Sequence, residues 1–575
     1  MLRRIFSYMK EYKKYAWLAL ICIGVEVVLE IMVPKLMADL IDIGVTNSDV
    51  PYIINKGIQM AVCAVAALIL GVGSARFSAL AGQGLGANIR KAEYEKLQSY
   101  SFSNIDHFSV SSLVTRLTSD VTNIQNAVST GMRPFGRSPV MLIFATTLAF
   151  KINSTLALVF LVALPVLAVL LIIIIINVGP RYGRMQGAVD LVNRCIEENL
   201  TAVRVVKSYV RGDYEIEKFR NVNDNLKNES EKAFGIAVLN MPAMQFVMYS
   251  TILGILLIGG RLINSGQMMI GQLTSFLSYV LLILNSLMMM SKVFLLMTRS
   301  LASAERIMKV IDEPIDITDE NAKDIEVKKG EIEFNHVWFK YKDTAKEYVL
   351  SDVSFHINAG QTVGIIGQTG SSKTTLIQLI PRLYDASKGE IKIDGISIKE
   401  YPVRHLRDAI SVVLQKNTLF SGSLIDNLRW GDENATLDEI KEACSIACVD
   451  EFIDRLPGGL DAEMGQEGVN VSGGQKQRIC IARAILKKPK VLILDDSTSA
   501  VDTATEGKIR NALAKKLPDM TKIIIAQRIS SVRHADQIII MDGGCVNAIG
   551  THESLLKTNK IYQEIYESQK EGADL

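Results

Sequence analysis

Long apolar stretches dominate the first half of the chain, and short ones the second half. Six long stretches approach or exceed the roughly 20 residues with which an α-helix crosses the hydrocarbon core of a bilayer. The fourth includes an unbroken run from Ile172 to Ile176, whereas Arg133 and Arg137 crowd the start of the third. The sequence after Arg299 is polar and periodic, so no seventh span is expected. The pattern predicts spans near residues 16–37, 58–80, 138–150 with its flanks, 156–178, 236–260 and 271–297.

Charged residues are unevenly distributed between these spans. Asp39, Asp42 and Asp49 follow the first span, and only Lys56 opposes them. Lysine and arginine accumulate on the cytoplasmic side of membrane proteins, so this acidic segment is expected to face outward. The segment between spans four and five is expected to face inward, because it carries Arg181, Arg184, Arg194, Arg204, Lys207, Arg211, Lys218 and Arg220.

The basic, amphipathic start of the chain, residues 2–10, predicts an interfacial helix on the cytoplasmic face. Six spans then place both termini in the cytoplasm. The two inner connections, residues 81–128 and 179–234, are about fifty residues long and have helical periodicity. Helices of that length project far beyond the bilayer. They could form a passive stalk or a set of levers whose tips contact a motor domain.

Two carboxylates and a group of methionines are the candidate substrate residues of this half. Glu26 and Glu30 lie four apart on one face of the first span. Ionisable groups at membrane depth are costly and usually functional. The pair could bind a cationic substrate, lie at the interface, or form ion pairs across the bundle with Arg76, Lys292 or Arg299. Methionine suits promiscuous surfaces but is also ordinary core filler. It recurs at Met241, Met244 and Met248, and again at Met288, Met289 and Met290.

The second half has a different periodicity, because short β-rich runs alternate with helices. An acidic, turn-rich segment precedes it, so we divide the chain into a membrane domain at 1–310, a linker at 311–328 and a third part at 329–575. The alternation predicts an α/β domain with a mainly parallel sheet. Its expected strands lie at 332–339, 362–366, 390–393, 410–414, 491–494, 522–526 and 537–541.

Composition agrees with a membrane domain fused to a water-soluble one. The 575 residues are 49% hydrophobic and 22% charged, with a mean hydropathy of +0.22. The net charge of +2 indicates no global attraction to nucleic acid. The seven cysteines are scattered. Cys444 and Cys448 have no nearby partners with zinc spacing, so reduced structural thiols are expected.

A phosphate-binding loop follows the buried-strand pattern of residues 362–366. Backbone amides of such a loop surround phosphates, Lys373 would reach the β- and γ-phosphates of ATP, and Thr374 would bind Mg²⁺. The pattern has glycine where Ser372 stands, and a side chain there is expected to strain the backbone. The loop and the first residues of the next helix are Gly367, Gln368, Thr369, Gly370, Ser371, Ser372, Lys373, Thr374 and Thr375.

Further motifs resemble those of the ATP-binding cassette (ABC) superfamily, and in the same order. Residues 471–478, Val-Ser-Gly-Gly-Gln-Lys-Gln-Arg, resemble the ABC signature, and Ile493–Asp502 resembles the Walker B strand and D-loop. By this resemblance Tyr341 stacks on adenine, Gln415 is the Q-loop glutamine that senses Mg²⁺, Asp495 binds Mg²⁺ and Asp502 is the D-loop aspartate. Ser472, Gly473, Gly474 and Gln475 would bind the γ-phosphate held by another subunit. Residues 465–468 resemble the cross-talk segment of exporters.

Essentially the whole chain resembles a half-transporter of the bacterial multidrug-exporter type. The resemblance implies a six-helix, all-α exporter domain with long intracellular helices, fused to an α/β P-loop ABC nucleotide-binding domain. Residues 108–120 resemble the first intracellular loop, so segments near 105–108 and 209–217 would be coupling helices. The cofactors implied are ATP and Mg²⁺, and the location is a bacterial cell membrane. The cargo would be a hydrophobic or amphipathic compound, with membrane lipids as the surroundings.

Two positions depart from the family pattern. The residue after the last Walker B aspartate is usually glutamate, the general base, and here it is Asp496. The switch residue is usually histidine, and here it is Gln527. Aspartate is shorter by one methylene, roughly 1.5 Å, and a misplacement of about 1 Å can cost about 100-fold in rate. Gln527 can donate a hydrogen bond but cannot become cationic. We therefore predict a site that binds ATP and hydrolyses it poorly.

Such a site implies a partner. Because each ATP in an ABC dimer lies between the phosphate loop of one chain and the signature of the other, the intact signature here would serve a competent site. We expect a second half-transporter with glutamate and histidine at the two altered positions and a damaged signature. Alternatives are a homodimeric lipid or drug flippase with slow hydrolysis, an ATP-gated regulatory membrane protein, and neutral change in an active site.

Overall fold

The computed structural model describes residues 1–342, 344–496 and 501–571. These residues form two compact units. The first contains Met1–Gln98 and Val110–Asp312, and the second contains Ser99–Ser109 and Glu313–Leu575. The second unit is therefore built from two separate parts of the chain.

The first unit is entirely helical. Within the described residues five helical stretches are long and apolar enough to cross a membrane: Lys10–Val45, Val50–Gln98, Val110–Ile152, Gly212–Asn264 and Ile270–Met290. Helix α8 contains the fourth predicted span. The six predicted spans fall on α2 (Lys13–Asp39), α3 (Val50–Gln98), α7 (Met132–Ile152), α8 (Ser154–Thr201), α11 (Asn240–Asn264) and α12 (Ile270–Ile311).

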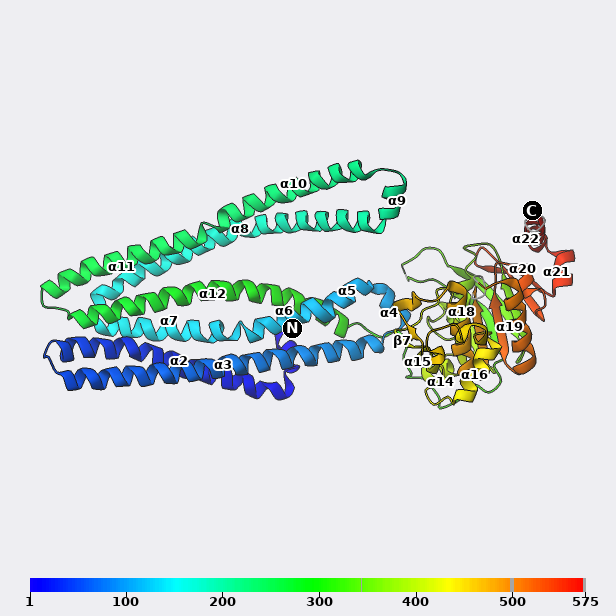
Figure 1. Ribbon diagram of the computed structural model, residues 1–575, viewed down its shortest axis with the longest axis horizontal. Coiled ribbons are helices and arrows are strands. Elements are labelled where there is room, and N and C mark those ends of the chain that lie inside the picture. Colours follow the sequence, from blue (N-terminus) through cyan, green and yellow to red (C-terminus); the bar gives the residue numbers. More distant parts are fainter. Residues whose placement is uncertain (343, 497–500, 572–575) are drawn as a thin grey trace. The chain divides into compact units, whose positions relative to one another are not determined.

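Several of these helices continue well beyond a bilayer's thickness. At 1.5 Å per residue, the 49 residues of α3 extend for about 74 Å. Helix α8 lies beside α10 (Gly212–Ala237), and short α9 (Val203–Ser208) joins them at one end (Figure 1). The second coupling helix was expected at 209–217. In the structure this segment covers the turn between α9 and α10 and the first residues of α10, which begins at Gly212.

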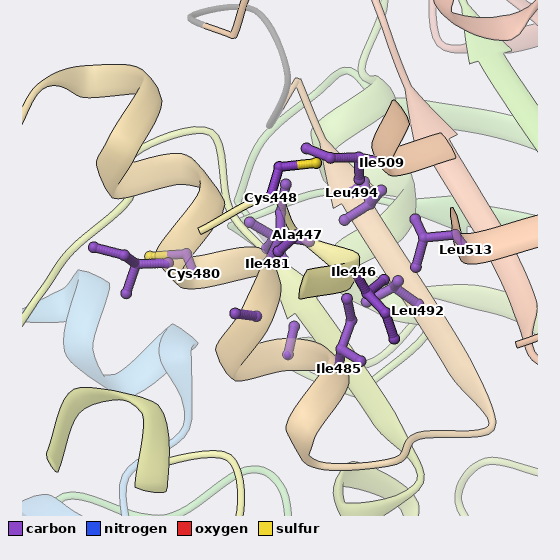
Figure 2. Close-up of a cluster of buried hydrophobic side chains, with 14 of the residues drawn as sticks. Ile446, Ala447, Cys448, Cys480, Ile481, Ile485, Leu492, Leu494, Ile509 and Leu513 are labelled. Carbon is purple, nitrogen blue, oxygen red and sulfur yellow. The ribbon is translucent and has the colours of Figure 1, made fainter. Parts of the chain in front are cut away.

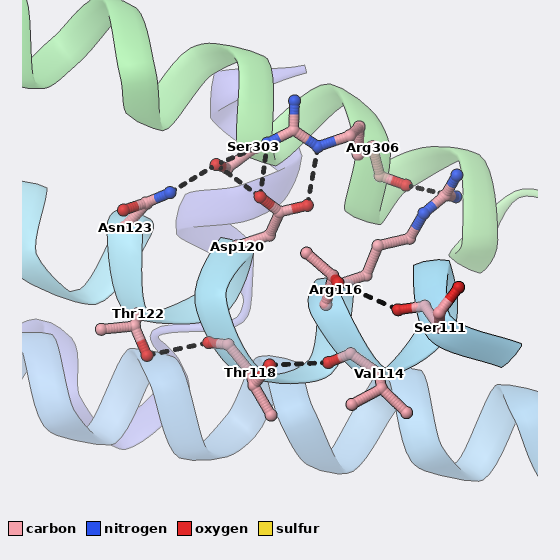
Figure 3. A network of polar contacts seen from close by, with 10 residues as sticks. Ser111, Val114, Arg116, Thr118, Asp120, Thr122, Asn123, Ser303 and Arg306 are labelled. Atoms are coloured by element: carbon pink, nitrogen blue, oxygen red, sulfur yellow. Dashed lines mark hydrogen bonds and ion pairs between the residues drawn. The ribbon is translucent and has the colours of Figure 1, made fainter. Parts of the chain in front are cut away.

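A buried acid ties the helical extensions together. Asp120 is 1% exposed and ends a π-helical segment, Arg116–Asp120. It accepts hydrogen bonds from Ser303 Oγ at 2.8 Å and from Arg306 Nε at 2.7 Å, both on α12 (Figure 3). Asn123, on α6 (Val121–Ser129), donates to Ser303 at 3.1 Å. A buried carboxylate whose hydrogen bonds come from a neighbouring helix fixes the register of the two helices.

The second unit has the predicted α/β organisation. Its six-stranded sheet has the order β12-β11-β3-β10-β9-β6, and every neighbouring pair is parallel except β11 with β12. The strands are β3 (Thr362–Ile366), β6 (Ile410–Val413), β9 (Val491–Asp495), β10 (Thr521–Ile525), β11 (Gln537–Asp542) and β12 (Cys545–Gly550). An antiparallel sheet, β2-β1-β4-β5, comprises Leu350–Ile357, Ile332–Phe339, Lys388–Ile393 and Ile396–Ser397.

Two hydrophobic clusters cover the two faces of the six-stranded sheet. Strand β9 alternates between them, since Leu492 and Leu494 enter one cluster and Val491 and Ile493 the other. In the first cluster the thiols of Cys448 and Cys480 lie among aliphatic side chains (Figure 2). Burial raises the pKa of both thiols, so they are inert core residues.

Helix α4 (Phe102–His107) belongs to the second unit, although it lies between α3 and α5 (Val110–Thr115) in the sequence. Ser101 caps it reciprocally with Asn104. The Asn104 amide donates to the carbonyl of Pro314 at 2.8 Å, and the Tyr384 hydroxyl donates to Asp106 at 2.6 Å. This helix overlaps the predicted first coupling segment.

Candidate functional site

The phosphate loop joins β3 to α13 (Lys373–Leu379), as the sequence predicts. Lys373 Nζ lies inside the loop, where it donates to the carbonyls of Gly367 and Gln368, both at 2.8 Å, and to Ser371 Oγ at 3.1 Å. Burial lowers the pKa of Lys373. A Cβ at Gly367 would lie 2.2 Å from the carbonyl oxygen of Met541, so only glycine fits there. The loop therefore holds its cation among oxygen acceptors that phosphate oxygens can replace.

Ser372 has the conformation that its position in the loop demands. Its backbone is left-handed, with φ 68° and ψ 22°. A side chain in this region costs roughly 1–2 kcal/mol, which glycine avoids. The expected strain is therefore present, while the amide of Ser372 stays in the loop.

Asp495 and Thr374 form a site whose chemistry fits Mg²⁺. Asp495 ends β9, is 2% exposed, and accepts a hydrogen bond from Thr374 Oγ1 at 3.3 Å. Its other carboxylate oxygen, Oδ2, is buried without a hydrogen-bond partner. Burial raises the pKa of Asp495. A carboxylate and a hydroxyl are oxygen ligands of the kind that Mg²⁺ prefers, and the ion would compensate the buried charge.

Asp496 and Gln527, the two departures from the family pattern, are in contact. Gln527 Nε2 donates to Asp496 Oδ2 at 2.9 Å, and Gln415 Nε2 approaches the same oxygen at 3.4 Å. Burial raises the pKa of Asp496, while the two amide hydrogen bonds act in the opposite direction. Asp496 also has a left-handed backbone, with φ 47°. The carboxylate at the position of the general base is therefore held by two amides.

Tyr341 offers a partly exposed ring next to the phosphate loop. Its hydroxyl lies 2.9 Å from Thr375 Oγ1 and donates to Gln378 at 3.3 Å. The rings of Phe339 and Tyr384 pack against it edge to face, with centroids 4.9 and 5.2 Å away. The ring is thus fixed in position and has surface left for an adenine.

The signature residues lie at the start of α18 (Gly473–Leu486). Ser472 is the N-cap, and its hydroxyl accepts from the Gln475 amide at 3.3 Å. Gln475 Oε1 in turn accepts from the Ser472 amide at 2.9 Å. Ser472 and Gly473 are exposed, so this helix N-terminus is accessible at the surface of the unit.

Asp502 caps α19 (Thr503–Lys516) by accepting from the Thr505 amide at 2.9 Å, and this bond lowers its pKa. The D-loop residues 497–500, which the sequence analysis included, lie outside the described residues. Thr369 and Gly370 complete the phosphate loop.

Glu26 and Glu30 line a cavity of about 760 Å³ in the first unit. Its walls come from α2, α3 and α12 and are mostly apolar, and Arg133 of α7 also lines it. The ion pairs of the two glutamates in the described residues are with other cations than the expected Arg76 and Arg299, and the side chain of Lys292 lies outside the described residues. Glu26 pairs with Arg133 at 2.6 Å and with Arg137 at 3.3 Å. Arg137 also pairs with Glu30 at 2.6 Å.

In the sequence, Arg133 and Arg137 were interpreted only as obstacles to a span. The missed signal is their spacing, since two cations four apart on one helix match two anions four apart on another. The methionines lie elsewhere. Met244 and Met248 pack in the apolar core of the first unit, Met289 is 43% exposed, and none of the three lines this cavity.

Comparison with known proteins finds a family match for each half of the chain. Residues 16–287 match the ABC transporter transmembrane region, and residues 350–499 match the ABC transporter family. The chain is 37% identical to the ABC transporter ATP-binding protein YfiB of Bacillus subtilis over all of both chains. It is 32% identical to an ATP-dependent lipid A-core flippase of Pseudomonas putida, covering 98% of this chain and 95% of that protein.

A solved structure of a bacterial Atm1-family ABC exporter with ATP bound has the same fold. It superposes with a TM-score of 0.84 at 22% identity, covering 97% of this chain and 99% of the other. With its helical membrane domain, its nucleotide-binding domain and relatives that match from end to end, the chain belongs to the ABC transporter family as an exporter-type half-transporter.

Proposed function

We propose that this chain is one half of a heterodimeric ABC exporter that moves hydrophobic or amphipathic compounds out of the cell. Its own Walker residues retain ATP and hydrolyse it slowly. Its signature, residues 472–475, completes a competent site on the partner. The partner carries the glutamate and histidine that are replaced here by Asp496 and Gln527.

The observation that supports slow hydrolysis is the bond between Asp496 and Gln527. A general base takes up a proton less readily when its carboxylate already accepts hydrogen bonds. Here Asp496 Oδ2 accepts from Gln527 and Gln415, and the side chain is one methylene shorter than glutamate. Gln527 cannot carry the positive charge that a histidine could supply. Retention of ATP is supported by three other groups. Lys373 lies inside the phosphate loop, Thr374 and Asp495 offer oxygen ligands to Mg²⁺, and the Tyr341 ring is partly exposed beside the loop.

The cavity of the first unit supports an amphipathic cargo. At about 760 Å³ it lies within the range of small-molecule sites, and its lining is largely apolar with one charged end. Alternation between open and closed states, driven by ATP, would carry such a molecule outward. The cytoplasmic location of both termini belongs to the same proposal.

ATP hydrolysis by the purified chain in lipid nanodiscs, with bound nucleotide quantified in parallel, tests this proposal. We expect little turnover together with retained ATP. The double variant Asp496→Glu, Gln527→His should raise hydrolysis by about 10- to 100-fold, because it restores the reach of the base and the cationic switch. Lys373→Ala is the control that removes nucleotide binding.

Substantial hydrolysis by the unaltered chain, abolished by Lys373→Ala, would contradict the slow site. That result would favour a homodimeric flippase, to which the 32% identity with a lipid A-core flippase also points. Stimulation of this hydrolysis by lipids, in the absence of any second protein, would then identify the homodimer.

A further inference from the structure

The last helix of the second unit binds the switch segment at two points. This helix, α22, spans Lys560–Glu571 and carries Gln569. Gln569 Oε1 accepts a hydrogen bond from the Ile529 amide at 2.8 Å. Gln569 Nε2 donates to the carbonyl of Gln527 at 2.7 Å. One side-chain amide therefore holds the backbone on both sides of Arg528, as a neighbouring strand would.

The two backbone groups that Gln569 binds lie at the edges of regular structure, one just beyond a strand and one at the start of a helix. Strand β10 ends at Ile525, so the carbonyl of Gln527 is beyond the parallel ladder. Ile529 opens α20 (Ile529–Val532), and the first amides of a helix have no acceptor within it. Gln569 supplies both missing partners, from 40 residues after Ile529 and 42 after Gln527.

Helix α22 is itself anchored in the core. Tyr562 is fully buried, and its hydroxyl lies 2.7 Å from His552 Nδ1. Ile565 and Tyr566 pack against the same cluster. Gln569 is seven residues from Tyr562 and three or four from the other two, so the anchoring face of the helix also carries Gln569. Helices α20 and α22 lie in contact at the end of the chain (Figure 1).

The anchored amide has a direct consequence for the nucleotide site. The side chain of Gln527 donates to Asp496 Oδ2, and the backbone of the same residue is fixed by Gln569. A shift of the Gln527 backbone would withdraw its amide from the carboxylate. The chain of contacts runs from the C-terminal helix through one switch residue to the position of the general base.

We propose that Gln569 is a positioning residue that keeps Gln527 on Asp496 and thereby keeps ATP hydrolysis at this site slow. This rests on the proposed function, in which the occupied Asp496 is a poor base. The C-terminal helix is then a regulatory element of the site. Its displacement withdraws the Gln527 amide from Asp496 and so makes the carboxylate a stronger base for the attacking water.

The test uses the full chain in lipid nanodiscs and the variant Gln569→Ala. Gln563→Ala is the matched control, because Gln563 lies on the same helix, is also half-buried and donates one bond, to the Leu556 carbonyl. Hydrogen exchange at the Ile529 amide should be about tenfold faster in Gln569→Ala. Single-turnover hydrolysis of bound ATP should also be about three- to tenfold faster. Gln563→Ala should change neither.

A double-mutant cycle separates positioning from general loosening. If Gln569 acts through Gln527, then Gln569→Ala has no effect on hydrolysis when Gln527 is already alanine. The same increase in the Gln527→Ala background, or equal effects of the two glutamine variants on α22, would overturn the proposal. Unchanged exchange at Ile529 in Gln569→Ala would also overturn it.

Failure of the proposed function has a different signature. In that case Gln527→Ala alone leaves hydrolysis and ATP retention as in the unaltered chain. The exchange measurement does not depend on the rate of hydrolysis, so it still decides whether Gln569 positions the switch segment.

Discussion

At the scale of single residues, Ser372 introduces backbone strain into the phosphate loop. It stands before Lys373 with a left-handed backbone, where a side chain is strained. We expect Ser372→Gly to raise the free energy of unfolding of the nucleotide-binding domain by about 1 kcal/mol. Differential scanning calorimetry of the full chain measures this. Gly370→Ala is the opposite control, because Gly370 has φ 86° and open space around its Cα, so backbone strain alone should lower the stability. A loss of stability in Ser372→Gly would contradict the strain.

The carboxylate of Glu439 takes part in both a helix cap and an ion pair, so both interactions depend on its protonation and therefore on pH. Its carboxylate accepts from the Thr436 amide and hydroxyl, both at 2.9 Å, and pairs with Lys488 at 2.5 Å. The Lys488 ammonium and the cap lower the pKa of Glu439 to about 2. Because the pKa is lower in the folded state, the ionised carboxylate stabilises the fold at pH values above about 4.3, the pKa in the unfolded chain. This contribution is lost as the pH falls towards 2.

Glu439→Gln should therefore unfold at a lower temperature than the unaltered chain at pH 6. The difference between the two unfolding temperatures should narrow below pH 4. Glu442→Gln, exposed on the same helix, should show no such narrowing.

At the scale of elements, α4 owes its place in the second unit to a few polar contacts. The Tyr384 hydroxyl donates to Asp106, and burial together with this bond raises the pKa of Tyr384. A hydrogen bond to a charged group contributes about 1.5–3 kcal/mol. Tyr384→Phe and Asp106→Asn should each loosen α4. The double variant should lose less stability than the sum of the two single losses, and the difference should be about 1.5–3 kcal/mol, the contribution of the shared hydrogen bond. Protease cleavage within residues 99–109 measures the loosening. Additive effects would show that the bond contributes nothing to docking.

The strands of the parallel sheet were predictable because each is a short apolar run bounded by turns. Strands β2 and β12 were missed. Both alternate with polar residues and pair antiparallel at the edge of a sheet, where half of each strand faces solvent.

At the scale of the whole molecule, each unit has its own core and its own buried charges. In the first unit, Arg137 contacts both Glu26 and Glu30. Without Arg137, Glu26 keeps its pair with Arg133, whereas Glu30 loses its ion pair. Removing one partner of a buried ion pair costs up to about 3–5 kcal/mol, because the other charge is left uncompensated. Arg137→Ala should therefore lower the thermal stability of the chain in nanodiscs by several degrees. Lys227→Ala, exposed on α10, is the control. Adding Glu30→Gln to Arg137→Ala should recover part of the lost stability. If it does not, the uncompensated charge of Glu30 is not the cause of the loss.

The sequence by itself determined the two-part architecture, the helical spans, the parallel sheet and the residue types of the nucleotide site. These depend on hydrophobic periodicity and on motifs whose members are close together in the chain. Only the tertiary structure decided which distant groups meet: Arg133 and Arg137 with the two glutamates, Tyr384 with Asp106, Gln527 with Asp496, and Gln569 with the switch backbone. Such contacts join residues that are far apart in the sequence. The hydrophobic periodicity of the sequence does not indicate which distant polar residue will be the partner of a given polar side chain, because folding alone brings the two together.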